Sequence, residues 1–154
     1  MLPFEDFTRR VRSSLARKLR LFRSNGGRPD MYSIGPHREL VGREIAPSIR
    51  SPVTATINDA SAFHSVQLRS GFVPALVTGQ ITSPATAKSR DIAVTINGRI
   101  VATAPTFKLA DSSVENFAVL VPETSFRNGT NRVQILSIHG SPTTPKLTLI
   151  GQAK

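Results

Sequence analysis

Alternation of apolar and polar positions dominates the chain from residue 51 onward. Short runs rich in Val, Ile, Thr and Phe follow a period of two, as β-strands do. Pro, Gly, Asn, Asp and Ser cluster between these runs, where turns are expected. We expect about eight strands, at residues 53–57, 63–68, 75–81, 92–96, 100–104, 117–121, 133–138 and 147–150. Short strands without intervening helices predict a mainly β fold, an antiparallel β-sandwich of jelly-roll or immunoglobulin-like type.

The clearest local prediction in this region is a β-hairpin. Asn97 and Gly98 separate the runs at 92–96 and 100–104. These two residue types readily take the positive φ angles that a type I′ turn needs at both central positions. A second Asn-Gly pair, Asn128-Gly129, precedes the run at 133–138 and indicates another turn there.

The first residues follow a helical period instead. Acidic residues stand in the expected first turn and basic residues near the last, which suits the helix dipole. Pro3 fits a first helical position, and Gly26 and Gly27 form a stop signal. The pattern predicts one amphipathic α-helix over about 3–23. Its apolar stripe consists of Phe4, Phe7, Val11, Leu15, Leu19 and Phe22.

Glycine and proline break any regular period between the helix and the first strand. The stretch MYSIGPHRELVG in this region keeps several apolar residues, so we expect an ordered loop that packs on the domain. The chain is therefore divided into a basic amphipathic helix at 1–24, an ordered connector at 25–50 and a β-sandwich domain at 51–154.

Charge changes the interpretation of the predicted helix. The chain has 154 residues and a formal net charge of +10, and residues 1–28 hold eight Lys or Arg against two acids. These cations either form the solvated face of a helix whose apolar stripe packs on protein, or they contact an anionic surface. A basic face beside a Phe/Leu/Val stripe favours lipid over nucleic acid. The candidate contacts are Arg9, Arg10, Arg12, Arg17, Lys18, Arg20 and Arg23.

Nucleic-acid binding has little further support in the sequence. The chain has no tryptophan and one tyrosine, and no motif of a known nucleic-acid-binding fold appears. The same apolar stripe is a candidate docking surface for protein, and it offers a contact for an oligomer when nothing else covers it.

A search for catalytic residues returns none. The chain has no cysteine, which excludes disulfides, thiolate metal sites and cysteine nucleophiles. His37, His64 and His139 lack a partner at metal-ligand spacing, so we interpret them as surface or strand-polar residues. No phosphate-binding glycine loop or nucleophile elbow occurs. The sequence assigns no catalytic, cofactor-binding or metal-binding residue, and we expect the chain not to be an enzyme by itself.

Three stretches together resemble a known family: LARKLRLFRSNGG, DMYSIGPHRELVGREI, and the strands around DIAVTINGRIVATAPTF. They are similar to the C-terminal region of actinobacterial membrane-anchored sulfatase-like hydrolases of the alkaline-phosphatase superfamily. In that family, membrane helices precede a catalytic domain, which is followed by a helix, a connector and a terminal β-sandwich. The resemblance covers almost the whole chain, and its motifs are structural.

The family's catalytic residues find no counterpart here. Its nucleophile is a cysteine or serine in a C/S-x-P-x-R motif, whereas the Ser-Pro pairs of this chain lack that spacing and the arginine. The resemblance implies a non-catalytic accessory domain that packs on or extends a sulfatase-like catalytic domain, in the same chain or a separate one. Its expected location is the extracytoplasmic side of the cell membrane, or the cytoplasm if the chain is complete as given. The alternative function is a module that binds carbohydrate, such as a cell-envelope glycan, or an anionic surface.

Overall fold

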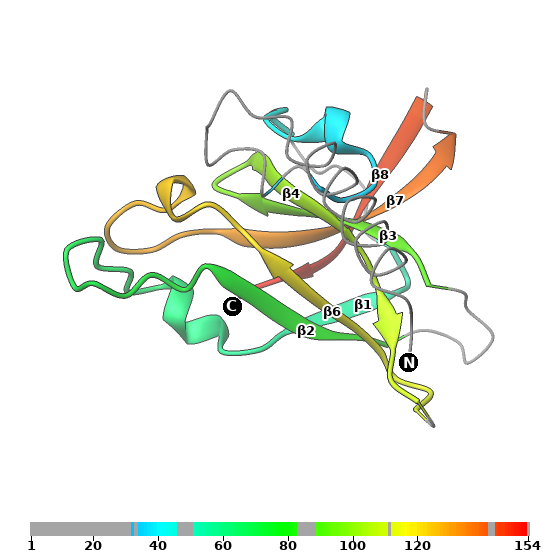
Figure 1. The fold of residues 1–154 in the computed structure, drawn as a ribbon, viewed down its shortest axis with the longest axis horizontal. Helices are drawn as coiled ribbons and strands as arrows, with labels where there is room; N and C mark the ends of the chain where they lie inside the picture. Colours follow the sequence, from blue (N-terminus) through cyan, green and yellow to red (C-terminus); the bar gives the residue numbers. More distant parts are fainter. Residues whose placement is uncertain are drawn as a thin grey trace, which may run out of the picture.

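The computed structural model of this protein describes residues 32, 34–45, 51–82, 89–110, 112–141 and 144–153. This part of the chain is mainly β, as predicted, with eight strands in two antiparallel sheets (Figure 1). The first sheet has the order β1-β2-β6-β5, and the second has the order β4-β3-β7-β8. The strands are β1 (Thr54–Ile57), β2 (Leu76–Thr82), β3 (Asp91–Ile96), β4 (Arg99–Pro105), β5 (Phe107–Lys108), β6 (Glu115–Leu120), β7 (Val133–Ser141) and β8 (Thr144–Gln152).

Besides 3₁₀ geometry at Tyr32, the described residues contain three short 3₁₀ turns. They are η2 (Arg38–Leu40), η3 (Ala60–Phe63) and η4 (Glu123–Ser125). The amphipathic helix predicted over about 3–23 lies outside the described residues, so it stays a prediction.

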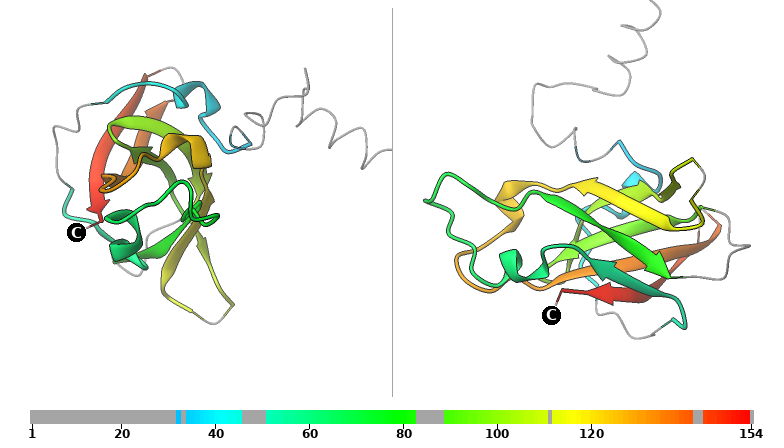
Figure 2. Two further views of the ribbon diagram at one scale, coloured as in Figure 1. Left: turned by 90° about the vertical axis from the view of Figure 1, so that its left-hand side faces the viewer. Right: turned by 90° about the horizontal axis from the view of Figure 1, so that it is seen from below.

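Side chains from both sheets meet in one shared core. Val77 and Phe117 point inward from the first sheet, and Ile92, Val94 and Ile135 point inward from the second. Alternation along each strand places these residues on one face, as the period of two requires. The two sheets therefore form a sandwich-like pair of layers, which Figure 2 shows from the end and from below.

The predicted strand at 63–68 is wrong. Phe63 ends the 3₁₀ turn η3, and Val66 makes only an isolated bridge to Gly129. Both side chains are buried, and the Phe63 ring stacks on that of Phe126 with a centroid separation of 6.1 Å. The segment has the apolar residues of a strand because it closes one end of the core, while its backbone follows a turn.

The hairpin between β3 and β4 is confirmed. Asn97 and Gly98 have φ angles of 53° and 90°, the positive values expected for its turn. The Asn97 amide donates to Oδ1 of the buried Asn131 at 2.9 Å. Asn131 in turn donates to the carbonyl of Arg127 at 2.8 Å. The two predicted Asn-Gly turns are thus tied together at one end of the sandwich.

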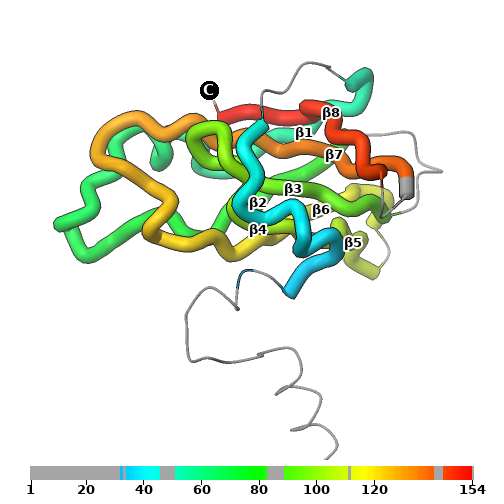
Figure 3. Tube along the Cα trace, turned by 90° about the horizontal axis from the view of Figure 1, so that it is seen from above, coloured from blue at the N-terminus to red at the C-terminus, as the bar shows by residue number. Residues whose placement is uncertain are grey.

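The described part of the connector covers the outer face of the second sheet. The N–H of Gly42 donates to the carbonyl of Ile100 at 2.8 Å, and the N–H of Ile100 donates to the carbonyl of Arg43 at 2.9 Å. A Cβ on Gly35 would lie 1.8 Å from the carbonyl oxygen of Thr103, so only glycine permits this approach to β4. Figure 3 shows the segment crossing β4 and β3. A second apolar cluster forms beneath it, from Leu40, Ala93, Ile100, Leu136 and Ile138.

Candidate functional site

All residues that the sequence singled out for binding precede the described part of the chain. This applies to the seven Lys and Arg of the anionic-surface prediction and to the apolar stripe of the predicted helix. They are Arg9, Arg10, Arg12, Arg17, Lys18, Arg20 and Arg23, and Phe4, Phe7, Val11, Leu15, Leu19 and Phe22. A candidate site has to be sought among the remaining residues.

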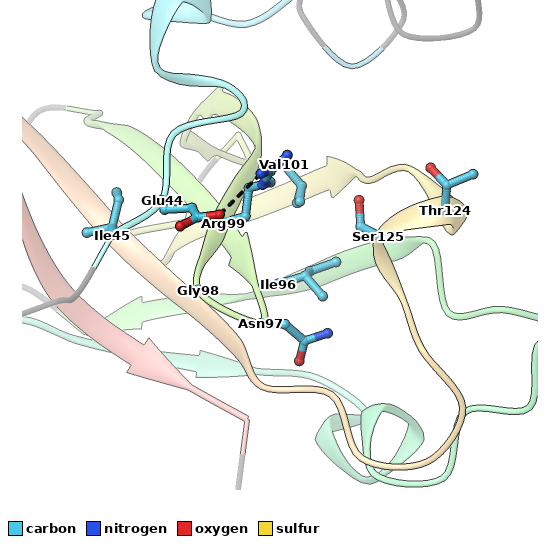
Figure 4. Close-up of a pocket in the computed structure, with 9 residues that line it drawn as sticks. All are labelled: Glu44, Ile45, Ile96, Asn97, Gly98, Arg99, Val101, Thr124 and Ser125. Carbon is cyan, nitrogen blue, oxygen red and sulfur yellow. Dashed lines mark hydrogen bonds and ion pairs between the residues drawn. The ribbon is translucent and has the colours of Figure 1, made fainter.

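A polar cleft of about 820 Å³ lies beside the β3–β4 turn (Figure 4). Ile96 and Val101 supply its apolar surface, and Thr124 and Ser125 contribute hydroxyl groups. Among the described residues that line it, Glu44 is the one carboxylate, 3.2 Å from Nη2 of Arg99, and none is a histidine. These groups supply no nucleophile with an adjacent base, which acyl-transfer chemistry needs.

The polar groups at the turn already serve the fold. Oδ1 of Asn97 accepts from the N–H of Arg132 at 3.1 Å, while its amide is bonded to Asn131. Glu44 and Arg99 also form an isolated bridge between the connector and β4. The cleft is therefore explained by the packing of the connector and hairpin, and it is not the leading candidate.

His37 is the one histidine that the structure places between two carboxylates. Its Nε2 lies 3.2 Å from Oδ2 of Asp91, and its Nδ1 lies 3.5 Å from Oε1 of Glu39. The side chain is partly buried, at 14% exposure. The interpretation of the histidines as surface or strand-polar residues did not include these two carboxylate neighbours. The contact joins the connector to the start of β3. In the described ranges, no group of three or more His, Asp or Glu side chains is placed to hold a metal ion.

A buried ion pair lies at the corner where β3, β5 and β6 begin. Nε of Arg90 is 2.8 Å from Oε1 of Glu115, whose side chain is 1% exposed. The hydroxyl of Thr106 donates to the same carboxylate oxygen at 2.6 Å and accepts from the N–H of Arg90 at 2.8 Å. The three groups are hydrogen-bond or ion-pair partners of one another, as is typical of a buried charge that stabilises the fold.

Exposed apolar side chains distinguish the first sheet from the second. Leu76 and Leu120 face each other across β2 and β6 and are 56% and 48% exposed. Phe72, 73% exposed, lines the same cleft as both leucines, and Ile34 lines a second cleft with Leu120. We call Ile34, Phe72, Leu76 and Leu120 the apolar strip.

A second apolar group lies at the other end of β6. The hairpin formed by β5 and the start of β6 projects from the body of the sandwich (Figures 1 and 2). Phe107, Leu109 and Val114 on this hairpin are 42%, 62% and 40% exposed. We call these three residues the apolar tip. Exposed apolar side chains that gather in one place make a candidate interaction surface.

The surface between strip and tip carries no charge at its outward positions. The exposed or half-exposed outward side chains of β1, β2 and β6 in this middle region are Thr54, Thr56, Thr78, Gln80, Thr82, Asn116 and Ala118. Sequence reasoning missed this surface, although alternation along β2 and β6 carries the signal. Val77 and Ile81 point inward, so Leu76 must point outward.

No helix in the described part of the chain is long and apolar enough to cross a membrane. A scan against protein-family models, a search of curated proteins and a search of solved structures each returned no match. The candidate site is therefore assigned on geometry, and it is the uncharged side of the first sheet with its apolar strip and tip.

Proposed function

We propose that this chain is a non-catalytic accessory domain, a β-sandwich of jelly-roll or immunoglobulin-like type, that packs on the catalytic domain of a membrane-anchored sulfatase-like hydrolase at the outer face of the cell envelope. The observation that carries this proposal is the apolar tip. Phe107, Leu109 and Val114 are 42%, 62% and 40% exposed in the described chain, and the hairpin that carries them projects from the body of the sandwich (Figure 2). Burying such an apolar surface against protein lowers the free energy, because it removes apolar area from water.

The unequal covering of the two sheets supports the same role. The connector closes the outer face of the second sheet with Leu40 and its apolar neighbours. Among the described residues, the outward side chains of β1, β2 and β6 are uncharged and at least partly exposed. A neutral face with apolar ends suits protein contact better than phosphate contact, which depends on clustered Lys and Arg.

The catalytic partner is identified by the sequence resemblance, and it has a direct test. Sequencing the genomic DNA upstream of the Met1 codon should reveal an open frame with membrane helices and a C/S-x-P-x-R motif, or a neighbouring gene that encodes them. A stop codon close upstream and no such gene nearby would contradict the proposed partner.

Leu109→Arg should uncouple the accessory domain from the catalytic domain. The substitution places a charge on the projecting hairpin, and burying that charge against an apolar partner is costly. In the whole hydrolase we expect the accessory and catalytic domains to unfold in one calorimetric transition, and the variant to give two. The turnover of a small soluble substrate should stay unchanged.

Leu68→Arg is the matched control for this experiment. Leu68 is 42% exposed but lies outside both the strip and the tip, so its replacement should leave the single transition intact. If Leu109→Arg and Leu68→Arg behave alike, the tip is not the contact with the catalytic domain.

A further inference from the structure

The apolar strip needs a separate occupant from the tip because it lies at the opposite end of β6. Leu76 and Leu120 are register partners at this end of the first sheet, whereas Phe107 pairs with Asn116 near the other end. Phe72, Leu76 and Leu120 line a cleft of about 710 Å³, and three of its further lining residues, Val73, Pro74 and Ala75, are also apolar. Polar residues also line this cleft, among them Asn58, Ser61 and Thr78. Its apolar part is the kind of surface against which an amphipathic helix lays its apolar face.

The described chain begins near Leu120, one residue of the strip. Tyr32 and Ile34 line a second cleft of about 350 Å³ together with Ala118 and Leu120. Leu120 lines both clefts, so the strip is continuous with the point where the preceding 31 residues join the sandwich. Residues 24–31 separate the predicted helix from Tyr32, and eight residues span at most about 27 Å. A helix that ends at residue 23 is therefore within reach of the strip.

Length and polarity of the predicted helix match the strip. Residues 3–23 would form a helix about 32 Å long. The seven-residue strand β2 extends about 23 Å, so such a helix is long enough to cover the strip. The helix offers six apolar residues in one stripe, with Phe4 and Phe22 near its ends.

The charges that line the two clefts do not repel this basic segment. Asp59 is the single charged residue that lines the two clefts, and neither cleft is lined by Lys or Arg. Residues 1–28 hold eight Lys or Arg against two acids. The basic segment therefore meets no repulsion at the strip, and its cations remain free to point outward.

We propose that residues 3–23 dock in cis as an amphipathic helix on the apolar strip, with the stripe from Phe4 to Phe22 facing Leu76 and Leu120. The docked segment covers Leu76 and Leu120 and leaves the apolar tip, at the other end of β6, available to another domain. A tether of eight residues gives the segment an effective concentration in the millimolar range, which favours the same chain over a second copy at micromolar concentration.

Hydrogen–deuterium exchange of the full chain, read by mass spectrometry, tests this proposal without any catalytic domain. We expect the amides of residues 3–23 to exchange at least tenfold slower than in Leu120→Arg, which corresponds to about 1.4 kcal/mol of docking free energy. Leu15→Arg on the stripe should have the same effect. Leu68→Arg, at an exposed leucine that lines neither cleft, should preserve the protection.

Three outcomes would overturn the proposal. The first is equal exchange of residues 3–23 in the wild type and in Leu120→Arg. The second is protection that rises with protein concentration, because a second copy would then be the occupant. The third is protection that appears only with phosphatidylglycerol vesicles, because the segment would then lie on lipid. Since Leu120 lies outside the apolar tip, none of these outcomes affects the test of the proposed function with Leu109→Arg.

Discussion

Glu115→Ala should lower the free energy of unfolding by about 3–5 kcal/mol. The carboxylate is 1% exposed, and it accepts from Arg90 at 2.8 Å and from Thr106 at 2.6 Å. Alanine removes the carboxylate and leaves the largely buried guanidinium of Arg90 without its negatively charged partner. The effect is large because an uncompensated charge loses its hydration and gains no partner in return. Urea denaturation of wild type and variant, followed by circular dichroism, measures the change.

Glu44→Ala is the matched control, because it removes the acid of an exposed ion pair. Glu44 and Arg99 are 79% and 60% exposed, and their closest atoms are 3.2 Å apart. Water screens this pair, so we expect a loss below about 1 kcal/mol. Similar losses in the two variants would show that burial does not set the strength of the Arg90–Glu115 pair.

Leu40→Ala should cost about 2–5 kcal/mol, although Leu40 stands in a segment without regular strands. The side chain is 1% exposed and packs on Ala93, Ile100, Leu136 and Ile138. Truncation opens a cavity between the connector and the second sheet, because the strands beneath cannot move inward. The midpoint of urea denaturation should fall while the transition stays single, since the connector folds together with the sandwich.

Leu68→Ala provides the comparison at an exposed leucine. Leu68 is 42% exposed, so its truncation should change the stability by about 0.5 kcal/mol or less. Were Leu40→Ala equally mild, residues 34–45 would be a loosely attached segment, and the outer face of the second sheet would also be available to a partner.

The fold class was predictable because its signals are local. Alternation marks each inward residue by its neighbours two positions away, and the Asn97-Gly98 turn depends on two adjacent residues. The strand wrongly predicted at 63–68 followed from applying the same rule of alternating apolar residues. Phe63 and Val66 are buried from a turn, and apolar composition alone does not distinguish a strand from a segment that plugs the end of a core.

The candidate surface was less accessible to sequence reasoning because it depends on what covers each sheet. Alternation indicates that Leu76 and Leu120 point outward, but it does not reveal that they are opposite each other across β2 and β6. The environments of His37 and Glu115 also depend on long-range contacts. Asp91 is far from His37 along the chain, and Arg90 is 25 residues from Glu115.

The outer faces of the two sheets differ in what covers them, and this difference leads to the proposed function. The second sheet is closed by the connector, and the strip on the first sheet lies where the N-terminal segment joins the sandwich. The tip then remains as the surface for another domain. Phe107 and Leu109 are 42% and 62% exposed, on the hairpin that projects from the sandwich (Figure 2).

The central claim is that the tip is buried against protein in the cell envelope. Hydroxyl-radical footprinting with mass spectrometry tests it most directly, by comparing labelling of Phe107 and Leu109 in the purified chain and in intact envelopes. We expect strong labelling of both residues in the purified chain and little in envelopes, with Leu68 labelled in both. Equal labelling of the tip in the two preparations would contradict the account.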